Sequence, residues 1–219
     1  MSKYTDWLNT IEFTANLNGG GRVLAPEFEK VLKNKKFKTI FEWCAGPSWI
    51  GMWLLEQGIG ETLITGDINE RYVDFVSRSA KNHDYDVRSY VSNNMRQIPK
   101  HEKFDLIVSN PPNYCNIQRS HPSGYLRDDI RPSDVNWKIH ADFYRNIPEY
   151  MDNDSRMFIS EIEIYSKEVY FDGELYDKRK DKPITTFSQM TKDNGLKIIN
   201  ITPYFVGETK CYILEIRKI

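Results

Sequence analysis

The segment from Phe41 to Gly51 has the composition of a ligand-binding turn. Its sequence, Phe-Glu-Trp-Cys-Ala-Gly-Pro-Ser-Trp-Ile-Gly, leads from apolar residues into small ones, and small residues between a strand and a helix let a ligand approach the backbone closely. The Gly-x-Gly-x-x-Gly pattern of dinucleotide sites is absent, and an acid, Glu42, precedes the turn. A carboxylate there would repel a pyrophosphate and suits a ligand that carries a positive group. The alternative is a plain strand–helix connection with a solvated Glu42.

A second acid, Asp67, follows Glu42 after 25 residues, at the end of a short apolar run. An acid at the tip of the second strand of such a fold can accept hydrogen bonds from both hydroxyl groups of a ribose. Asp67 could instead be the N-cap of the helix that follows. Its position directly after the strand favours the ribose role.

The third motif is Asn110–Tyr114, with the sequence Asn-Pro-Pro-Asn-Tyr, which comes directly after an apolar run. Two prolines stiffen the backbone and remove two N–H donors, so that carbonyl groups near them are left to accept hydrogen bonds from a ligand. The side-chain oxygen of Asn110 can accept another. An amino group bound in this way can point its lone pair at a methyl donor.

These motifs lie in an alternation of short apolar runs and longer amphipathic stretches. The last two apolar runs have no helix between them, only a turn at Gly207, so we expect them to form an antiparallel hairpin at the edge of the sheet. Strands are predicted over 39–43, 62–65, 86–91, 104–109, 156–160, 196–203 and 211–217, and helices over 49–57, from 69 onward, and over 137–151 and 185–193.

Strands separated by helices of this length build a parallel sheet with helices on both faces. The predicted fold class is therefore α/β: a single Rossmann-like, doubly wound, mostly parallel sheet with a C-terminal antiparallel hairpin, over residues 39–219.

Two polar stretches fall outside the alternation, Asn113 to Asn136 and Ser166 to Pro183. In open parallel sheets ligands bind beyond the carboxyl ends of the strands, and the first stretch leaves its strand at that end. We therefore expect it to bind the acceptor, and to be mobile when empty and to close over the acceptor. The second is interpreted as a solvated excursion.

The composition restricts the class of protein. Thirty basic and 31 acidic residues give a formal net charge of -1, which neither indicates nor excludes a nucleic-acid partner. Cys44, Cys115 and Cys211 are widely separated, and with the four histidines they form no metal-ligand pattern. The N-terminus has no apolar signal core, and no apolar run approaches the ~20 residues of a membrane span. We expect a cytoplasmic protein without a metal or a membrane anchor.

Together the three motifs resemble those of the class I S-adenosylmethionine-dependent methyltransferases, in particular the branch with Asn-Pro-Pro-(Tyr/Phe) after the fourth strand. The resemblance covers roughly Gly19 to Arg217. It implies S-adenosyl-L-methionine as the cofactor and transfer of its methyl group to a planar or amide nitrogen. Members of the branch methylate release-factor glutamine, exocyclic amines of nucleic-acid bases, and some small molecules.

The resemblance also implies roles for individual residues. Glu42 and Gly46 would lie against the methionine part of the cofactor, Asp67 would bind its ribose, and Ile68 would pack on its adenine. Asn93 stands where the family has an Asp, and its carbonyl could accept the same hydrogen bond from the adenine amino group. The residues assigned to the cofactor are Arg22, Glu42, Cys44, Ala45, Gly46, Asp67, Ile68, Asn93 and Asn110, and those assigned to catalysis are Asn110, Pro111, Pro112 and Tyr114.

The segment before the first strand, Gly19–Glu27, resembles the family's cofactor-covering segment. Residues 1–38 are therefore expected to form a helical, cofactor-covering N-terminal segment. Arg22 within it could pair with the carboxylate of the cofactor or be a solvated surface charge.

The chain departs from the family pattern in two motifs. Cys44 and Ser48 replace the first and third glycines of the turn, a variant that resembles some bacterial methyltransferases, which also carry an equivalent of Trp-Lys-Ile-His at 137–140. Asn113 stands where the Asn-Pro-Pro motif ends in an aromatic residue, and Tyr114 is one place late. This departure bears on the recognition of a planar base more than on methyl transfer.

Several acceptors remain open. We expect an amide or amine nitrogen in protein or nucleic acid; a small molecule is the alternative. An oxygen acceptor would require a base such as His140 or His121. Only 41 residues precede Glu42, too few for the helical substrate domain of the release-factor enzymes.

Two other classes of protein share this architecture. A non-catalytic subunit that binds S-adenosylmethionine is disfavoured by the presence of Asp67 and Asn110, and an NAD(P) or nucleotide-sugar enzyme is disfavoured by the missing glycine pattern. The oligomeric state stays open.

Overall fold

The protein is described here from a computed structural model, which places residues 21–115, 133–135, 137–162, 169–171, 174–176 and 187–219. Predictions about the remaining residues, among them His121, lie outside the described part of the chain.

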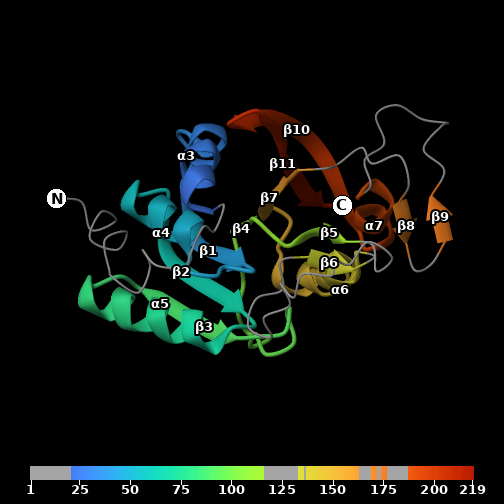
Figure 1. The fold of residues 1–219 in the computed structure, drawn as a ribbon. Helices are drawn as coiled ribbons and strands as arrows, with labels where there is room; N and C mark the ends of the chain where they lie inside the picture. The colour runs from blue at the N-terminus through green and yellow to red at the C-terminus, as the bar shows by residue number, and fades with distance from the viewer. Residues whose placement is uncertain (1–20, 116–132, 136, 163–168, 172–173, 177–186) are drawn as a thin grey trace, which may run out of the picture.

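A seven-stranded sheet with the order β10-β11-β7-β4-β1-β2-β3 forms the centre of the molecule (Figure 1). The strands β7, β4, β1, β2 and β3 run parallel to one another. At the other edge, β11 pairs antiparallel with β7, and β10 pairs antiparallel with β11. The predicted mostly parallel sheet with a C-terminal hairpin is thus confirmed. The strands span Phe37–Trp43 (β1), Gly60–Asp67 (β2), Val87–Val91 (β3), Leu106–Ser109 (β4), Arg156–Glu161 (β7), Leu196–Val206 (β10) and Thr209–Lys218 (β11).

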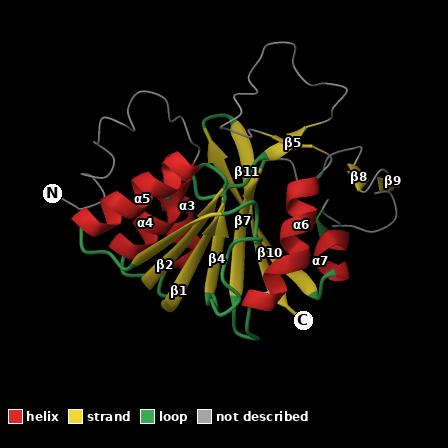
Figure 2. Cartoon of the chain, turned by 90° about the horizontal axis from the view of Figure 1, so that it is seen from below, coloured by secondary structure: helices red, strands yellow, loops and turns green. Residues whose placement is uncertain are grey.

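Helices cover both faces of this sheet, as predicted (Figure 2). The side chains of each strand alternate between the two faces, so Ile40 and Leu63 pack with the helices of one face, and Phe41 and Ile64 with those of the other. The first face carries α3 (Gly21–Leu32), α4 (Trp49–Glu56) and α5 (Glu70–Asn82); the second carries α6 (Lys138–Asn146), the 3-10 helix η2 (Ile147–Tyr150) and α7 (Ser188–Asp193).

One local prediction needs correction, and one alternative is excluded. The helix predicted over 137–151 is an α-helix only to Asn146, because Pro148 has no N–H to donate, and a 3-10 turn follows. Asp67 is not the N-cap of α5: that residue is Asn69, whose side chain accepts a hydrogen bond from Arg71 N at 3.0 Å. The position of Asp67 before the cap leaves its carboxylate at the tip of β2.

The two long polar stretches contain short strands. Asn113–Cys115 (β5) and Ser133–Val135 (β6) pair in parallel, with Tyr114 opposite Asp134. Val169–Phe171 (β8) and Glu174–Tyr176 (β9) form an antiparallel pair. The predicted closure of the first stretch over an acceptor concerns residues outside the described part of the chain. Within the described ranges, no helix combines the length and the apolar character that crossing a bilayer requires.

Candidate functional site

The carboxyl ends of β1, β2 and β4 meet at one edge of the sheet. Trp43 of β1 is level with Gly66 of β2 and with Ser109 of β4. The Ser109 hydroxyl also donates a hydrogen bond to the carbonyl of Trp43 at 2.5 Å, which ties two of the strand ends together. The residues that follow these three are Cys44, the first residue of the turn, Asp67, the second acid, and Asn110, the first residue of the Asn-Pro-Pro motif. The structure therefore brings the three predicted motifs together.

The turn after β1 is built on left-handed backbone. Cys44, Gly46 and Ser48 have φ angles of 50°, 49° and 60°. This conformation costs a residue other than glycine roughly 1–2 kcal/mol, so Cys44 and Ser48 are held in it by their surroundings. No described atom lies within 4 Å of the position that a Cβ on Gly46 would take, so the turn is open above Gly46 as far as the described residues are concerned.

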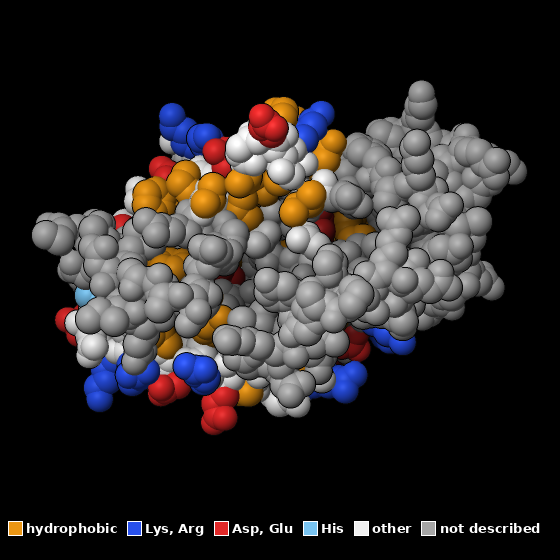
Figure 3. Space-filling model, in the orientation of Figure 1, with side chains coloured by type: hydrophobic (Ala, Val, Ile, Leu, Met, Phe, Trp, Pro, Cys, Tyr) orange, Lys and Arg blue, Asp and Glu red, His pale blue; other side chains and the backbone are white. Residues whose placement is uncertain are grey.

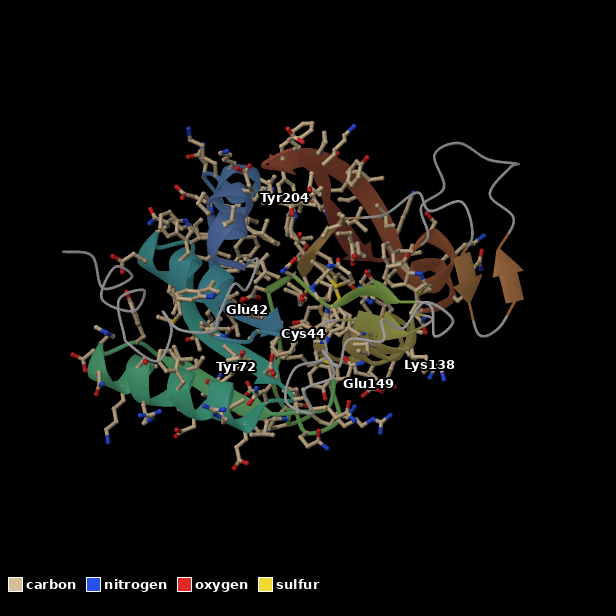
Figure 4. The ribbon with its side chains drawn as sticks, in the orientation of Figure 1. Glu42, Cys44, Tyr72, Lys138, Glu149 and Tyr204 are labelled. Atoms are coloured by element: carbon tan, nitrogen blue, oxygen red, sulfur yellow. The ribbon has the colours of Figure 1, made fainter. Side chains whose placement is uncertain are left out.

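Glu42 lies beneath this turn and does not face solvent (Figure 4). Its side chain is only 3% exposed. The carboxylate accepts hydrogen bonds from the Ser48 hydroxyl at 2.5 Å and from the backbone N–H groups of Gly51 at 2.8 Å and Ile50 at 3.3 Å. Ile50 and Gly51 are in the first turn of α4, where N–H groups have no partner within the helix. Glu42 thus caps α4 from outside the helix.

The contacts of Glu42 explain why position 48 is a serine, where the family has a glycine, and why position 51 is a glycine. Ser48 is the N-cap of α4, and it makes no side-chain cap of its own because its hydroxyl donates to Glu42 instead. A Cβ on Gly51 would lie 2.5 Å from Leu63 Cδ1 and 2.7 Å from Glu42 Oε2. Gly51 therefore leaves room for the buried carboxylate, and Ser48 supplies a hydrogen bond to it that glycine could not.

Burial also changes the acidity of this edge. Loss of hydration raises the pKa of Glu42 to about 7, against the hydrogen bonds from Ser48, Gly51 and Ile50, which lower it. The negative charge of Asp67 adds to the rise. Burial likewise raises the pKa of the Cys44 thiol. Cys44 is therefore a neutral thiol at physiological pH, and Glu42 exchanges its proton near neutrality.

Asp67 connects the turn to the start of α5. One carboxylate oxygen accepts from Gly46 N at 2.7 Å and the other from Asn69 N at 2.8 Å. Burial raises the pKa of Asp67, and these backbone hydrogen bonds oppose the rise. Unlike Glu42, Asp67 is only partly buried. Each oxygen has a further lone pair, so the carboxylate can accept from a ligand as well.

Apolar side chains flank Asp67 on the exposed side. Ile68 is 40% exposed, and Val91, at the end of the adjacent β3, is 45% exposed. Asn93 follows β3 with an exposed side chain, and its backbone N–H donates to Gln97 Oε1 at 2.8 Å. Asn94, its neighbour, donates to Ile139 O and to Asp142 Oδ2, and so ties this edge to α6.

The Asn-Pro-Pro motif continues β4 at the same edge. Asn110 and Pro112 are half-buried, and Pro111 is buried. Two other predicted site residues belong to described elements, Arg22 to α3 and Tyr114 to β5. Their side chains lie outside the described part of the chain, so their predicted roles stay predictions.

Sequence reasoning missed a group of buried ionisable residues. His140 is fully buried, with Nδ1 2.6 Å from Asp134 Oδ2 and Nε2 2.8 Å from Glu161 Oε1. From the sequence, His140 is only a candidate base for an oxygen acceptor. The available signals were a His in an apolar helical stretch and an acid, Glu161, at the end of a buried strand, but nothing in their spacing joins them.

The described residues fit S-adenosylmethionine as a ligand. The turn is open above Gly46, a carboxylate that can still accept hydrogen bonds lies at the tip of β2, and exposed apolar side chains stand beside it. A ribose joined to a flat adenine matches the last two features, since hydroxyl groups donate to carboxylates and ring faces pack on aliphatic groups.

Comparison with known protein families matches part of the chain. Residues 14–121 match the methyltransferase small domain. None of the curated proteins matches the chain significantly in sequence.

Solved structures share the fold at low sequence identity. TrmN from Thermus thermophilus superimposes with a TM-score of 0.59 at 12% identity, over 90% of this chain and 49% of that one. The ribosomal protein L11 methylase from Lactobacillus delbrueckii subsp. bulgaricus gives 0.57 at 15%, over 93% and 81%. The 16S rRNA N2 methyltransferase RsmC from T. thermophilus, solved with S-adenosylmethionine (AdoMet) and guanosine, gives 0.56 at 13%, over 94% and 44%. The chain thus spans about half the length of TrmN and of RsmC.

The close contact at Gly51 gives a first test of this site. Gly51→Ala should destabilise the fold by about 1–3 kcal/mol, the usual cost of overpacking, although alanine is the better helix former. Chemical denaturation measures the change. A gain in stability, as helix propensity alone would give, would contradict the position of Glu42 beneath α4.

The raised pKa of Glu42 gives a pH dependence. The native state holds the Glu42 proton more tightly than the unfolded chain, so this group favours folding at low pH, and its contribution falls as pH rises from about 4.5 to about 7. Glu42→Gln removes this dependence. The free energy of unfolding of the wild type should fall relative to that of the variant by on the order of 1–3 kcal/mol across this window. Parallel profiles of the two proteins would refute the assignment.

Proposed function

We propose that the chain is a class I S-adenosylmethionine-dependent methyltransferase, and that it transfers a methyl group from this cofactor to an amide or amine nitrogen of a protein or a nucleic acid. The observation that carries the proposal is the convergence of the open turn, Asp67 and Asn110–Pro112 on one edge of the sheet. When bound, S-adenosyl-L-methionine supplies an electrophilic methyl group.

The residues of the turn and of β2 hold the cofactor in this proposal. Asp67 accepts the ribose hydroxyls, Ile68 packs against adenine, and Asn93 accepts from the adenine amino group. The turn residues Cys44, Ala45 and Gly46 lie along the methionine part. Glu42 acts through them, because its carboxylate holds the start of α4 and with it the shape of the turn.

Arg22, in the first turn of α3, pairs with the carboxylate of the cofactor in this proposal, and the segment 1–38 covers it. The start of α3 belongs to the same face of the sheet as α4, which supports this arrangement.

The Asn-Pro-Pro segment holds the acceptor. The Asn110 side chain and the carbonyl of Pro111 accept hydrogen bonds from the amino group, and Pro112 and Tyr114 shape the site around it. Holding the nitrogen in line with the methyl group is the main contribution of the protein, because a neutral amine or amide nitrogen needs little acid–base chemistry to react.

The position of His140 supports a nitrogen rather than an oxygen acceptor. An oxygen acceptor would need a base to remove its proton. Both ring nitrogens of His140 face carboxylates inside the protein, so His140 is unable to take a proton from an acceptor. His121, the other candidate base, lies outside the described residues.

Two of the similar structures bear on the class of acceptor. RsmC, solved with guanosine, supports a base amine, and the ribosomal protein methylase supports a protein side chain. On the face in Figure 3, the described Lys and Arg side chains are spread along the rim among Asp and Glu side chains rather than gathered in one patch. We also place the protein in the cytoplasm, which the free thiols of Cys44 and Cys211 support.

Two measurements test the proposal. Native mass spectrometry detects binding of S-adenosylmethionine, and cofactor labelled in its methyl group then reports transfer into separated protein, RNA, DNA and metabolite pools. Absence of binding would refute the proposal as a whole. Binding without transfer to any pool would favour a non-catalytic subunit, and labelling of metabolites alone would favour a small-molecule methyltransferase.

Asp67→Ala should weaken cofactor binding by roughly 1.5–3 kcal/mol, the range for hydrogen bonds to a charged group, or about tenfold to a hundredfold in Kd. Calorimetry on the folded variant measures this. Asp74→Ala is the matched control, because Asp74 is exposed on α5 and pairs only with the exposed Arg78 among the described ion pairs. Unchanged affinity in Asp67→Ala would remove Asp67 from the site.

Asn110→Ala should separate cofactor binding from methyl transfer. Its affinity for S-adenosylmethionine should stay within a few-fold of the wild type, while methyl transfer falls by roughly a hundredfold because the acceptor is no longer positioned. Asn82→Ala, at the exposed end of α5, serves as the control. Turnover at the wild-type rate in Asn110→Ala would exclude the proposed role.

A further inference from the structure

Three buried residues from different elements form one ionic group. Asp134 belongs to β6, His140 to the first turn of α6, and Glu161 is the last residue of β7. None of the three is more than 2% exposed. The imidazole lies between the two carboxylates, with Nδ1 2.6 Å from Asp134 and Nε2 2.8 Å from Glu161. We call these three residues the His140 clamp.

The protonation of the clamp follows from its geometry. Each ring nitrogen faces a carboxylate oxygen, so each contact needs one proton to be a hydrogen bond. An imidazolium between two carboxylates has two such protons, and so does a neutral imidazole beside one protonated acid. Removing either proton sets a nitrogen lone pair against a carboxylate oxygen. The clamp is therefore intact only while it holds two protons.

The surroundings of His140 favour its charged form. Burial alone would lower its pKa, but the charge of Glu161 and the hydrogen bonds to Asp134 and Glu161 outweigh burial and raise the pKa to about 9. Aromatic rings surround the imidazole: Trp43 and Trp137 meet it edge-on at 5.2 and 4.9 Å between ring centroids, and Phe187 lies 5.2 Å away.

Other titratable groups packed nearby carry no charge near neutrality. Among the described residues these are the Cys44 thiol after β1, the Tyr144 phenol of α6 and the Tyr204 phenol of β10, whose pKa values burial raises above their ordinary range. The charge balance of the clamp is thus set by Asp134, Glu161 and His140 themselves.

The clamp lies next to the segment assigned to the acceptor. Asp134 is opposite Tyr114 in the pairing of β6 with β5, and β5 follows directly after Asn110–Pro112. Glu161 follows Ser160 at the end of β7, the strand that runs parallel to β4 on its other side. Asp134 also accepts from the backbone N–H groups of Ile139 and His140 at 2.8 and 2.9 Å. One imidazole thus joins β6, α6 and β7 around the end of β4.

We propose that His140 is a positioning residue for methyl transfer. It fixes β6, and through β6 the strand β5 (Asn113–Cys115) that directly follows Asn110–Pro112, against the end of β7. The inference rests on the proposed function only in placing the acceptor at Asn110–Pro112 and Tyr114. His140 touches neither cofactor nor acceptor in this role. Its loss should leave the cofactor side, built on the ends of β1, β2 and β3, unchanged.

The proposal predicts a dependence on pH that is specific to this segment. The pKa of His140 in the folded protein, about 9, lies above the ordinary 6.5, so the clamp contributes fully below pH 6.5 and loses its contribution as pH rises to about 9. Glu161→Gln keeps an oxygen that can accept from Nε2 but removes its charge. This variant should lower the pKa of His140 and move the loss of the clamp to lower pH.

The test uses the full chain and needs no methyl acceptor. Nuclear magnetic resonance follows the titration of His140, and hydrogen exchange gives protection factors for Asn113–Cys115, with β1 and β2 amides as the internal control. In the wild type, His140 should lose its proton and Asn113–Cys115 should lose protection together, near pH 9. In Glu161→Gln, both losses should occur together at a lower pH. His140→Gln should lose protection in Asn113–Cys115 at every pH and keep its affinity for S-adenosylhomocysteine, measured by calorimetry, within about threefold.

The outcomes distinguish this proposal from the proposed function. If the titration of His140 moves in Glu161→Gln while the protection of Asn113–Cys115 does not, the clamp has no positioning role. Full protection in a folded His140→Gln would overturn the proposal as well. If His140→Gln does not fold, Glu161→Gln alone decides. Failure of the wild type to bind S-adenosylhomocysteine would instead count against the proposed function and leave the exchange result standing.

Discussion

Two helices at the carboxyl edge of the sheet begin on a carboxylate supplied by another element. The N-cap residues Ser48 and Trp137 are both in left-handed conformation, and neither makes a side-chain cap. The second and third N–H groups of α4 and α6 are therefore left for an outside acceptor. Glu42 of β1 provides it for α4, and Asp134 of β6 provides it for α6. The shape of the whole edge depends on these two contacts.

The two carboxylates are stabilised in different ways. Glu42 has no cation beside it among the described ion pairs; the Ser48 hydroxyl, two backbone donors and the positive end of a helix compensate its burial only in part, and its pKa rises to about 7. Asp134 is in contact with His140, whose surroundings favour the charged form of the imidazole. Breaking a buried ion pair costs much free energy, because it leaves a buried charge without a partner. A buried carboxylate without a cationic partner can instead change its charge by taking up a proton, and is adjustable in this sense. In the proposed function, the cofactor side thus rests on the adjustable carboxylate and the acceptor side on the one held by His140.

The sequence was sufficient for the arrangement of the strands and for the three motifs at their tips. Alternating periodicity identifies strands and helices, and parallel topology then forces Glu42, Asp67 and Asn110 to the same edge, without knowledge of any side-chain contact. The direction of Glu42 could not be predicted in this way. It depends on which face of β1 meets the start of α4, and therefore on contacts with Ser48 and Gly51.

The His140 clamp and the pairing of β5 with β6 were beyond prediction for a related reason. Glu161 is 21 residues from His140, and nothing in that spacing indicates contact. β5 and β6 have three residues each, too few to show periodicity, and only their pairing identifies them as strands. Pro148, by contrast, did carry a readable signal for the end of α6, and the prediction of one continuous helix overlooked it.

The pairing of β5 with β6 has a consequence for how proteins of this design diverge. The 17 residues between them, 116–132, start and finish on neighbouring strands, which lie about 4.8 Å apart whatever the length of chain that joins them. The entropy of closing such a loop grows only with the logarithm of its length, about 0.6 kcal/mol for each doubling. Insertions, deletions and exchanges in this stretch therefore cost little and leave Asn110 where it is. If this stretch recognises the acceptor, as the proposed function has it, evolution can revise that recognition while the proposed site of methyl transfer stays unchanged.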